Sequence, residues 1–196
     1  MAEWITSIDL SILHWIAAHV QNAFLDVVMP VLTMLGEHGI FCIALSAVLI
    51  AIPKTRKLGV SIAFALAFGF LIGNLTIKPI VSRIRPYAVD PSLKSAVLEN
   101  FPLAGFPHDA SFPSGHTLAA FEAAVPIFIR SKKWGIPALA LALGVALSRL
   151  YLTVHYPTDV LAGAVLGTCF AILASALADL IWKKIAARRA AKQQQQ

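Results

Sequence analysis

Long apolar runs are the feature of this sequence that most constrains its fold. They cover roughly residues 39–53, 58–77, 115–129, 134–154 and 160–182. A helix of about 20 apolar residues crosses the hydrocarbon core of a bilayer, so three runs are long enough alone and two need flanking residues to complete a span. Backbone groups in lipid must be hydrogen-bonded within the protein, and a helix achieves this within its own segment. The runs therefore predict an all-α integral membrane protein.

The composition and the N-terminal segment agree with this class. Hydrophobic residues make up 58% of the chain and charged residues 13%, whereas a soluble domain carries about a quarter charged residues. Residues 4–20 place apolar side chains at helical spacing, interrupted by Asp9, His14 and His19. This pattern predicts an amphipathic helix at the membrane interface, within residues 1–22.

The remaining segments complete the expected architecture. Residues 23–36 are apolar apart from Asp26 and contain Pro30. They form either a kinked sixth span or a half-buried helix, and we prefer the span. The polar end of the chain, 188–196, is expected to be a disordered tail. The prediction is one membrane-embedded domain over residues 1–196, a bundle of about six helices with the interfacial helix at its N-terminus.

The positions of the basic residues predict the orientation. Eleven of the sixteen Lys and Arg residues fall in three segments that alternating spans place on one side: Lys54, Arg56, Lys57, Arg130, Lys132, Lys133, Lys183, Lys184, Arg188, Arg189 and Lys192. The positive-inside rule assigns that side, and with it the C-terminus, to the cytoplasm. The net charge of +6 is then explained by topology, and we expect no nucleic-acid partner.

Five further basic residues fall on the opposite, outer side, where topology gives no reason for them: Lys78, Arg83, Arg85, Lys94 and Arg149. Ionisable groups at the ends of membrane helices are functional candidates. Lys78 and Arg85 are two helical turns apart, so they share a face if the helix continues past Pro79. Such a pair suits an anion, because Arg holds phosphate oxygens with a planar fork. The alternative is a pair of snorkelling interface anchors.

A second outer cluster, SFPSGHT at 111–117, ends the longest loop, 86–113. Ser114 is a good N-cap residue, and Gly115 lets the backbone come close to a ligand. The helix that starts here aims free N–H groups and the positive end of its dipole outward, which suits an anion. His116 in its first turn is able to donate a proton. The alternative is a capped helix with an interfacial histidine.

The third cluster is SRLYLTVHYPTD at 148–159. Pro157 predicts that the last helix starts there. Asp159 lies four residues after His155, close enough to accept a hydrogen bond from one imidazole nitrogen. That bond fixes the tautomer and leaves the other nitrogen free as a base or nucleophile. Arg149 adds a third cation to the set.

Together the clusters contain what phosphoryl transfer through a covalent phosphohistidine requires. His155 attacks phosphorus, Asp159 stabilises the charge on its ring, and His116 protonates the leaving oxygen. Water then hydrolyses the intermediate. The charge on the phosphate oxygens is neutralised by Lys78, Arg85, Arg149 and the turn of Ser114, Gly115 and His116. No group of carboxylates is spaced to hold a metal, so we expect metal-independent catalysis without a cofactor.

These residues resemble a family signature. Lys78-x6-Arg85-Pro86, Pro113-Ser114-Gly115-His116 and Ser148-Arg149-x5-His155-x3-Asp159 are similar to the three-part signature of the type-2 phosphatidic acid phosphatase superfamily. The resemblance implies a helical membrane bundle with His155 as nucleophile, Asp159 as its partner and His116 as general acid. It also implies that the phosphate is bound by Lys78, Arg85, Ser114, Gly115 and Arg149.

The substrate implied by the resemblance is a lipid phosphate in the bacterial plasma membrane. Similar bacterial members act on undecaprenyl diphosphate, phosphatidylglycerophosphate or phosphatidic acid. The outward site and the short outer loop favour undecaprenyl diphosphate, recycled as the lipid carrier of peptidoglycan synthesis. A transporter or scramblase of anionic lipids is the alternative from another class. It explains the basic residues but leaves His116 and His155 without a role.

Several ionisable residues outside the signature have weaker expectations. Glu122 lies in the middle of a span, on a different helix face from His116, and either pairs inside the bundle or lies near the lipid path. Arg83 is a candidate for head-group contact, and His108 and Asp109 are candidates for substrate contact. Asp179 is expected to pair with a lysine or arginine of the tail. Nothing in the sequence indicates the oligomeric state or the residues that line the lipid tail.

Overall fold

The computed structural model describes residues 3–99 and 106–193, and every regular element in them is helical. In chain order these are α1 (Glu3–His19), α2 (Ala23–Met34), η1 (Glu37–Gly39), α3 (Ile40–Ala51), α4 (Arg56–Phe68), the π-helix η2 (Gly69–Ile77), α5 (Lys78–Val81), α6 (Pro86–Val89), η3 (Pro91–Leu93), α7 (Ala96–Glu99), α8 (Gly115–Arg130), α9 (Lys132–Tyr151) and α10 (Pro157–Gln193). Three stretches are long and apolar enough to cross a membrane: Arg56–Val89, Lys132–Tyr151 and Pro157–Ala191. The all-α prediction is confirmed for the described residues.

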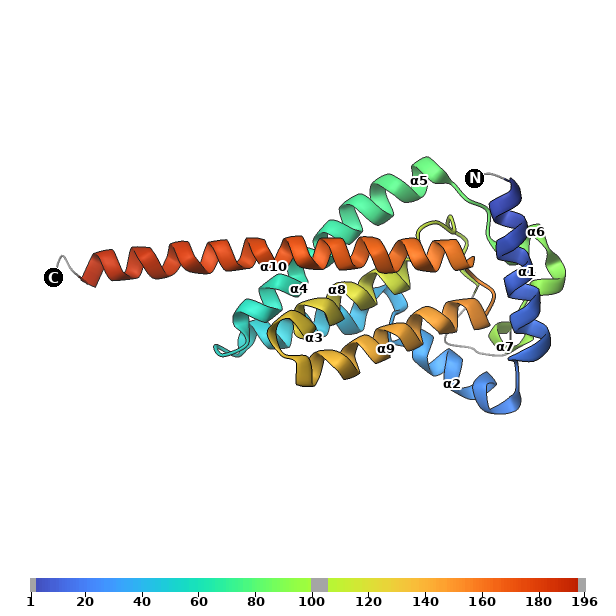
Figure 1. Cartoon of the computed structure of the whole chain (residues 1–196), viewed down its shortest axis with the longest axis horizontal. Helices are drawn as coiled ribbons and strands as arrows, with labels where there is room; N and C mark the ends of the chain where they lie inside the picture. The colour runs from blue at the N-terminus through green and yellow to red at the C-terminus, as the bar shows by residue number, and fades with distance from the viewer. Residues whose placement is uncertain (1–2, 100–105, 194–196) are drawn as a thin grey trace.

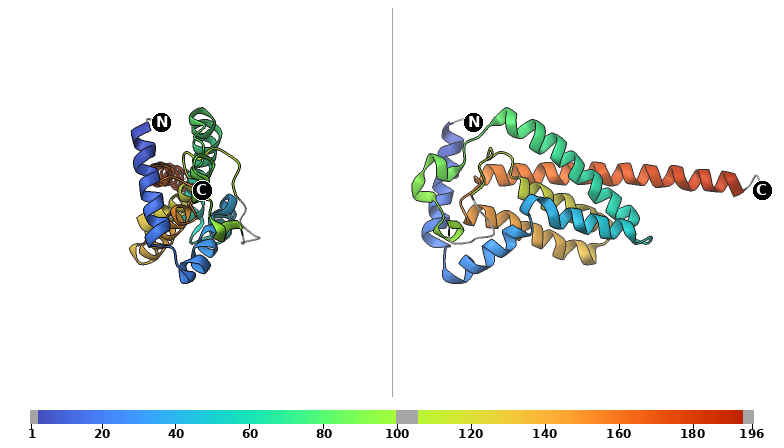
Figure 2. Two further views of the ribbon diagram at one scale, coloured as in Figure 1. Left: turned by 90° about the vertical axis from the view of Figure 1, so that its right-hand side faces the viewer. Right: turned by 180° about the vertical axis from the view of Figure 1, so that it is seen from behind.

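The helices form a bundle around α8, which packs against α9, α10 and α4 (Figure 1). α10 is the longest helix, and its C-terminal part projects beyond one end of the bundle. We call this end, with residues 52–57 and 130–133, the tail end. α1 lies across the opposite end together with α6 and α7 (Figure 2). We call this the site end.

Two glycines let α10 approach α8 closely at the site end. A Cβ atom at Gly163 would lie 2.7 Å from the carbonyl oxygen of Ser114, and one at Gly167 would lie 2.6 Å from that of Leu118. Membrane helices associate through such close packing of small residues. The first turns of α8 and α10 are therefore held side by side, and Ser114 N–H donates to the carbonyl oxygen of Asp159 (3.1 Å).

The segment from 23 to 51 differs from its prediction. α2 and α3 follow one another from the site end to the tail end, separated by the turn of η1 (Figure 1). Each has 12 residues, which at 1.5 Å per residue is about 18 Å, too short to cross a core of about 30 Å alone. The chain passes along the bundle once here, so the expected separate span over 23–36 is wrong. The break between α2 and α3 places Glu37 partway along the bundle.

Lys78 and Arg85 also differ from their predicted relation. α4, η2 and α5 form one continuous rod that ends at Val81, and Ser82 takes a left-handed conformation with φ 44°. Lys78 therefore lies on the rod and Arg85 lies beyond it. They do not share a helix face, because the helix ends between them. The turn at Ser82 brings Arg85 back toward the bundle instead.

At the tail end, charged residues pair near the surface. Asp179 bonds Lys57 Nζ (2.7 Å) and Arg130 Nη2 (3.3 Å). Its expected pairing with a tail residue is wrong, because α4 and α8 bring their own cations to this level of α10. Residues 188–193 continue α10 in place of the expected disorder, since their Ala, Arg and Lys are strong helix formers. Residues 194–196 lie outside the described residues.

α1 has the extent expected of the interfacial helix. It buries Asp9 and Leu13 against the bundle. Its exposed side carries large apolar side chains: Trp4, Ile8, Ile12 and Trp15. An exposed apolar stripe on a helix that lies across the bundle end suits a membrane interface, and contact of this stripe with lipid stays a prediction.

Candidate active site

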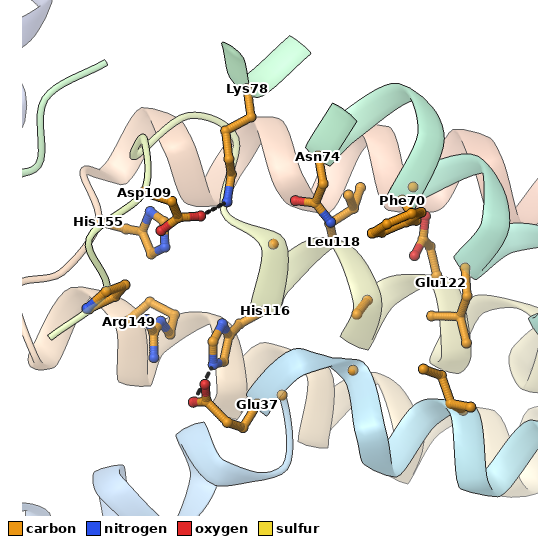
Figure 3. A pocket seen from close by; sticks show the side chains of 18 of the residues that line it. Glu37, Phe70, Asn74, Lys78, Asp109, His116, Leu118, Glu122, Arg149 and His155 are labelled. Carbon is orange, nitrogen blue, oxygen red and sulfur yellow. Dashed lines mark hydrogen bonds and ion pairs between the residues drawn. The ribbon is translucent and has the colours of Figure 1, made fainter. Parts of the chain in front are cut away.

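A cavity of about 750 Å³ lies at the site end and extends along α8 (Figure 3). α8, η1, α3, η2 and the loop at 106–109 contribute to its walls. Six of the eight predicted site residues line it: Lys78, Arg85, Gly115, His116, Arg149 and His155. The other two, Ser114 and Asp159, are buried behind this lining. Three clusters that are far apart in the sequence therefore meet at one cavity.

His155 and Asp159 form a buried pair. Nδ1 of the ring lies 3.4 Å from Asp159 Oδ2, and Arg85 Nη1 lies 3.3 Å from Nε2. A guanidinium only donates hydrogen bonds, so Nε2 accepts and the ring proton is on Nδ1, facing Asp159. Ser111 Oγ also donates to Asp159 Oδ2. The nitrogen opposite Asp159 therefore carries a lone pair.

The turn between α9 and α10 explains this geometry. Pro157 opens α10, where its missing N–H is not needed, and Tyr156 N–H donates to Asp159 Oδ2 (3.0 Å). Burial lowers the pKa of His155 to about 3, the hydrogen bond with Asp159 opposes the shift, and the charges of Arg85 and Arg149 add to it. His155 is neutral at physiological pH, so its Nε2 is available as a nucleophile.

Arg83 holds the other oxygen of Asp159. Its Nη1 donates to Asp159 Oδ1 (2.6 Å), and its Nη2 donates to Asp9 Oδ2 of α1 (2.7 Å). The guanidinium also lies 3.7 Å from the centroid of the Tyr156 ring, a cation–π contact. Arg83 is buried behind the cavity lining, which differs from the expected head-group contact. It bridges two buried carboxylates and so links α1 to Asp159.

Lys78 and Arg85 meet at one carboxylate. Asp109 accepts from Lys78 Nζ through Oδ2 (2.5 Å) and from Arg85 Nη2 through Oδ1 (2.6 Å). Burial opposes ionisation of Asp109, but the hydrogen bonds and charges of the two cations outweigh it and lower its pKa to about 2. A carboxylate thus occupies the place between the cations where phosphate oxygens were expected. His108, the other loop candidate, also lines the cavity.

His116 is held by a residue that the sequence did not indicate. Its Nε2 lies 3.2 Å from Glu37 Oε2 (Figure 3). η1 comes so close that a Cβ atom at Gly36 would lie 2.8 Å from His116 Cδ2. The carboxylate fixes one ring nitrogen and keeps the other for a second partner. Gly36 and Gly39, which flank Glu37, are a sequence signal for a tight turn but not for a partner of His116.

Arg149 supplies a buried cation to the same cavity. Its Nη1 donates to Thr33 Oγ1 of α2, and its Nε has no hydrogen-bond partner in the described part of the chain. A buried charge is costly unless it is paired, so an anion in the cavity would stabilise the buried Arg149 side chain.

The turn before α8 differs in detail from its prediction. Ser114 is the N-cap residue, but its side chain makes no capping hydrogen bond with the backbone. Its Oγ accepts from Thr117 Oγ1 (3.0 Å), and the residue is fully buried. Gly115 does line the cavity, and a Cβ atom there would lie 3.9 Å from Lys78 Nζ. The helix N-terminus itself, rather than the Ser114 hydroxyl, is the group that is placed to bind an anion.

Two further features complete the site. Glu122 lines the same cavity as His116 although they lie on different faces of α8, because the cavity extends along α8 between η1 and η2 (Figure 3). In residues 3–99 and 106–193, no group of three or more His, Cys, Asp or Glu side chains is placed to hold a metal ion. The chemistry that the residues themselves supply is a neutral imidazole, a second imidazole on a carboxylate, and cations for an anion.

Comparison with known proteins shows the family to which the chain is similar. A family model described as the PAP2 superfamily matches residues 54–183. Undecaprenyl-diphosphatase of Sulfolobus acidocaldarius is 31% identical over 154 residues, which cover 78% of this chain and 70% of the relative. The undecaprenyl-diphosphatase BcrC of Bacillus subtilis is 28% identical over 173 residues, which cover 86% and 82%.

A solved structure shares the fold. The crystal structure of a transmembrane PAP2-type phosphatidylglycerolphosphate phosphatase from Bacillus subtilis superposes with a TM-score of 0.71. The two sequences are 26% identical, and the superposition covers 92% of this chain and 89% of the other. The likeness therefore extends over most of both chains.

Proposed function

The chain belongs to the PAP2 superfamily and is a membrane lipid phosphatase, and from this premise we propose that it hydrolyses undecaprenyl diphosphate to undecaprenyl phosphate. The observation that carries the proposal is the cavity in which His155, with its lone pair on Nε2, lies beside Arg85 and opposite a second histidine, His116. The activity named for two relatives supports the choice of substrate.

The reaction consists of two displacements at phosphorus. His155 Nε2 attacks the terminal phosphorus, forming an N–P bond, while the bond to the bridging oxygen breaks. His116 transfers a proton to that oxygen, and undecaprenyl phosphate leaves. Water then attacks the phosphohistidine and gives a proton to His116. The N–P bond breaks, which releases phosphate and restores both histidines.

The surrounding charges stabilise these steps. Lys78, Arg85, Arg149 and the N-terminus of α8 hold the phosphate oxygens once the Asp109 carboxylate has moved away from the two cations. Phosphorylation makes the His155 ring cationic, and Asp159 stabilises that charge through Nδ1. None of these steps uses a metal ion, so phosphate release is expected to continue in an excess of EDTA. Loss of activity in EDTA, restored by a divalent metal, would contradict this mechanism.

We place the site end at the outer surface of a bacterial plasma membrane. The basic residues near the tail end, among them Lys57 and Arg130, support a cytoplasmic C-terminus by the positive-inside rule. Ser92 is exposed at the site end, so a cysteine placed there in a chain without Cys42 and Cys169 should react with an impermeant reagent on intact cells. Labelling only after lysis would show that the site end faces the cytoplasm.

The substrate is tested by direct competition. Purified protein is given undecaprenyl diphosphate, phosphatidylglycerophosphate and phosphatidic acid, and kcat/KM for phosphate release is compared. We expect undecaprenyl diphosphate to be preferred. A tenfold preference for either glycerolipid phosphate would overturn the proposal in favour of the activity named for the structural neighbour. Release of phosphate from none of them would favour a transporter or scramblase.

A further inference from the structure

The Glu37 carboxylate lines the cavity, but the reaction described above does not use it. Glu37 lies in η1, the short turn between α2 and α3, and its Oε2 lies 3.2 Å from Nε2 of His116 (Figure 3). A carboxylate beside a phosphate site disfavours the bound anion, because like charges repel. The position of Glu37 therefore needs a reason other than substrate binding.

A contribution to stability does not supply that reason. The Glu37 side chain is 35% exposed, and ion pairs that reach the solvent add little to stability. The turn around it is also built for close approach to the imidazole ring. Gly39 takes a left-handed conformation with φ 67°, and a Cβ atom at Gly36 would lie 2.8 Å from Cδ2 of His116. This geometry indicates that Glu37 acts through the ring that it contacts.

The contact assigns different tasks to the two ring nitrogens of His116. Nε2 faces Glu37, so Nδ1 is the nitrogen left for the substrate. A histidine ring that acts as an acid carries protons on both nitrogens. The resulting cation is unfavourable beside Lys78, Arg85 and Arg149, which line the same cavity. Glu37 accepts the hydrogen bond from Nε2–H and offsets this repulsion.

The other carboxyl groups of the cavity are placed differently. Asp109 bonds two of the cations. Glu122 lies further along α8, where a Cβ atom at Gly69 would lie 2.0 Å from its Oε1. The remaining titratable side chains of the lining are imidazoles, those of His108 and His155. The carboxylate that contacts His116 is therefore that of Glu37.

We propose that Glu37 is a positioning residue that orients His116 and keeps its ring protonated for the departure of a strongly basic leaving group. The proton on Nδ1 moves to the ester oxygen as the P–O bond breaks, and Nε2–H stays bonded to Glu37. The water of the second displacement returns a proton to Nδ1. The inference rests on the proposed phosphatase reaction and adds that Glu37 determines how basic a leaving group the site can release.

The test compares two lipid phosphates that differ only in the basicity of the leaving group. The phenolate of para-dodecylphenyl phosphate is basic and leaves with a proton, whereas that of its ortho-nitro derivative leaves without one. Glu37→Gln should lower kcat/KM for the phenyl ester about tenfold, part of the about 100-fold or more that a general acid contributes, and should keep the nitrophenyl ester within about twofold. Glu99→Gln is the matched control, because Glu99 pairs with Lys94 outside the cavity, and it should change neither value.

A double-mutant cycle tests whether Glu37 acts through His116. His116→Ala should lower kcat/KM for the phenyl ester at least as much as Glu37→Gln does. Adding Glu37→Gln to His116→Ala should then cause no further loss, because residues that act as a unit are not additive. Glu37→Asp keeps the negative charge and should retain more phenyl ester activity than Glu37→Gln. A further loss in the double variant would contradict an action through His116.

The outcomes separate this inference from the proposed substrate. An equal loss with both esters in Glu37→Gln, or no loss with the phenyl ester, would overturn the role of Glu37. A wild-type protein that uses the nitrophenyl ester alone, or neither ester, would overturn it as well. If Glu37→Gln does not fold by thermal unfolding, Glu37→Met is compared in the same way. Failure of the wild-type protein to hydrolyse undecaprenyl diphosphate in a parallel assay would contradict the proposed function alone.

Discussion

The two ends of the bundle carry ion pairs of similar length in very different surroundings. At the site end, Arg83 bonds Asp159 at 2.6 Å, and the two side chains are 6% and 0% exposed. At the tail end, Lys57 bonds Asp179 at 2.7 Å, and these side chains are 35% and 45% exposed. Exposed ion pairs contribute about 0–1 kcal/mol, whereas removing one partner of a buried pair costs about 3–5 kcal/mol. The distance between the paired atoms therefore does not show which pair is costlier to break.

This difference in burial reflects how the charges are arranged at each end of the bundle. The tail-end cluster pairs Lys57 and Arg130 with Asp179 near the surface, and the excess of basic residues there is what the positive-inside rule predicts for a cytoplasmic end. The site end buries its charges although apolar side chains would pack there at lower cost. It also directs Lys78, Arg85 and Arg149 into one cavity, where Asp109 is the carboxylate that meets two of them. Substitutions at the two ends should consequently have effects of very different size.

The largest effect is expected at His155. His155→Ala removes the proposed nucleophile and should lower phosphate release from a lipid phosphate about 1,000-fold or more. The matched control is His14→Ala, because His14 is an exposed histidine at the same end that pairs with Asp90 (3.0 Å). The control should keep its activity. Turnover by His155→Ala above a tenth of the wild-type rate would contradict the phosphohistidine mechanism.

The next effect is expected at Asp9, which contacts neither the cavity nor His155. Asp9→Asn leaves Arg83 with one carboxylate, so Arg83 competes more strongly for Asp159 and weakens its support of the His155 ring. We expect kcat to fall about tenfold with little change in KM, and the free energy of unfolding to fall by about 3 kcal/mol.

A second carboxylate contact of α1 provides the control for Asp9. Asp90 also binds α1, through His14, but its side chain is partly exposed. Asp90→Asn should therefore leave kcat within about twofold of the wild-type value, as expected for a surface pair. If both variants show the same kcat, α1 does not act on the active site through Arg83.

A smaller effect is expected at Asp109, where the substitution should improve substrate binding instead of lowering activity. Its carboxylate competes with the substrate for Lys78 and Arg85, so Asp109→Asn should lower KM about fivefold, within the range of one charged hydrogen bond. Because its folded pKa is lowered to about 2, its ion pairs persist above that range and are lost only as the pH falls toward it. The carboxylate is charged at about pH 6 and at about pH 8 because both lie above this pKa, so the decrease in KM should be the same at the two values. An increase in KM would show that Asp109 positions Arg85 instead.

The smallest effect is expected at the tail end. Asp179→Asn removes the exposed ion pairs with Lys57 and Arg130, which should lower the free energy of unfolding by less than about 1 kcal/mol. Phosphate release should stay within about twofold of the wild-type rate. If Asp179→Asn lowers the free energy of unfolding or phosphate release as much as Asp9→Asn does, the two ends do not differ in the way proposed.

Much of the site was predictable because its chemistry is local in the sequence. His155 and Asp159 are one helical turn apart, and Gly115 and His116 open a helix, so spacing alone indicated their relation. The partners of these residues come from distant segments: Asp9 and Arg83 for Asp159, and Glu37 for His116. Each of these partners is a single charged residue, and the pattern of the segment around it indicates only an interfacial helix, a loop or a span. Spacing within the segment therefore did not indicate which distant residue it would bind.

By itself the sequence determined the helical class, the basic character of the tail end and the candidates for the reacting groups, because apolar run length, charge position and short spacings are properties of neighbouring residues. Tertiary structure decided the single passage of α2 and α3, the meeting of Lys78 and Arg85 at Asp109, and the place of Glu122 in the cavity. These depend on how closely helices approach and where each one breaks. In lipid that is governed by the packing of small residues between distant segments, which a linear pattern does not contain.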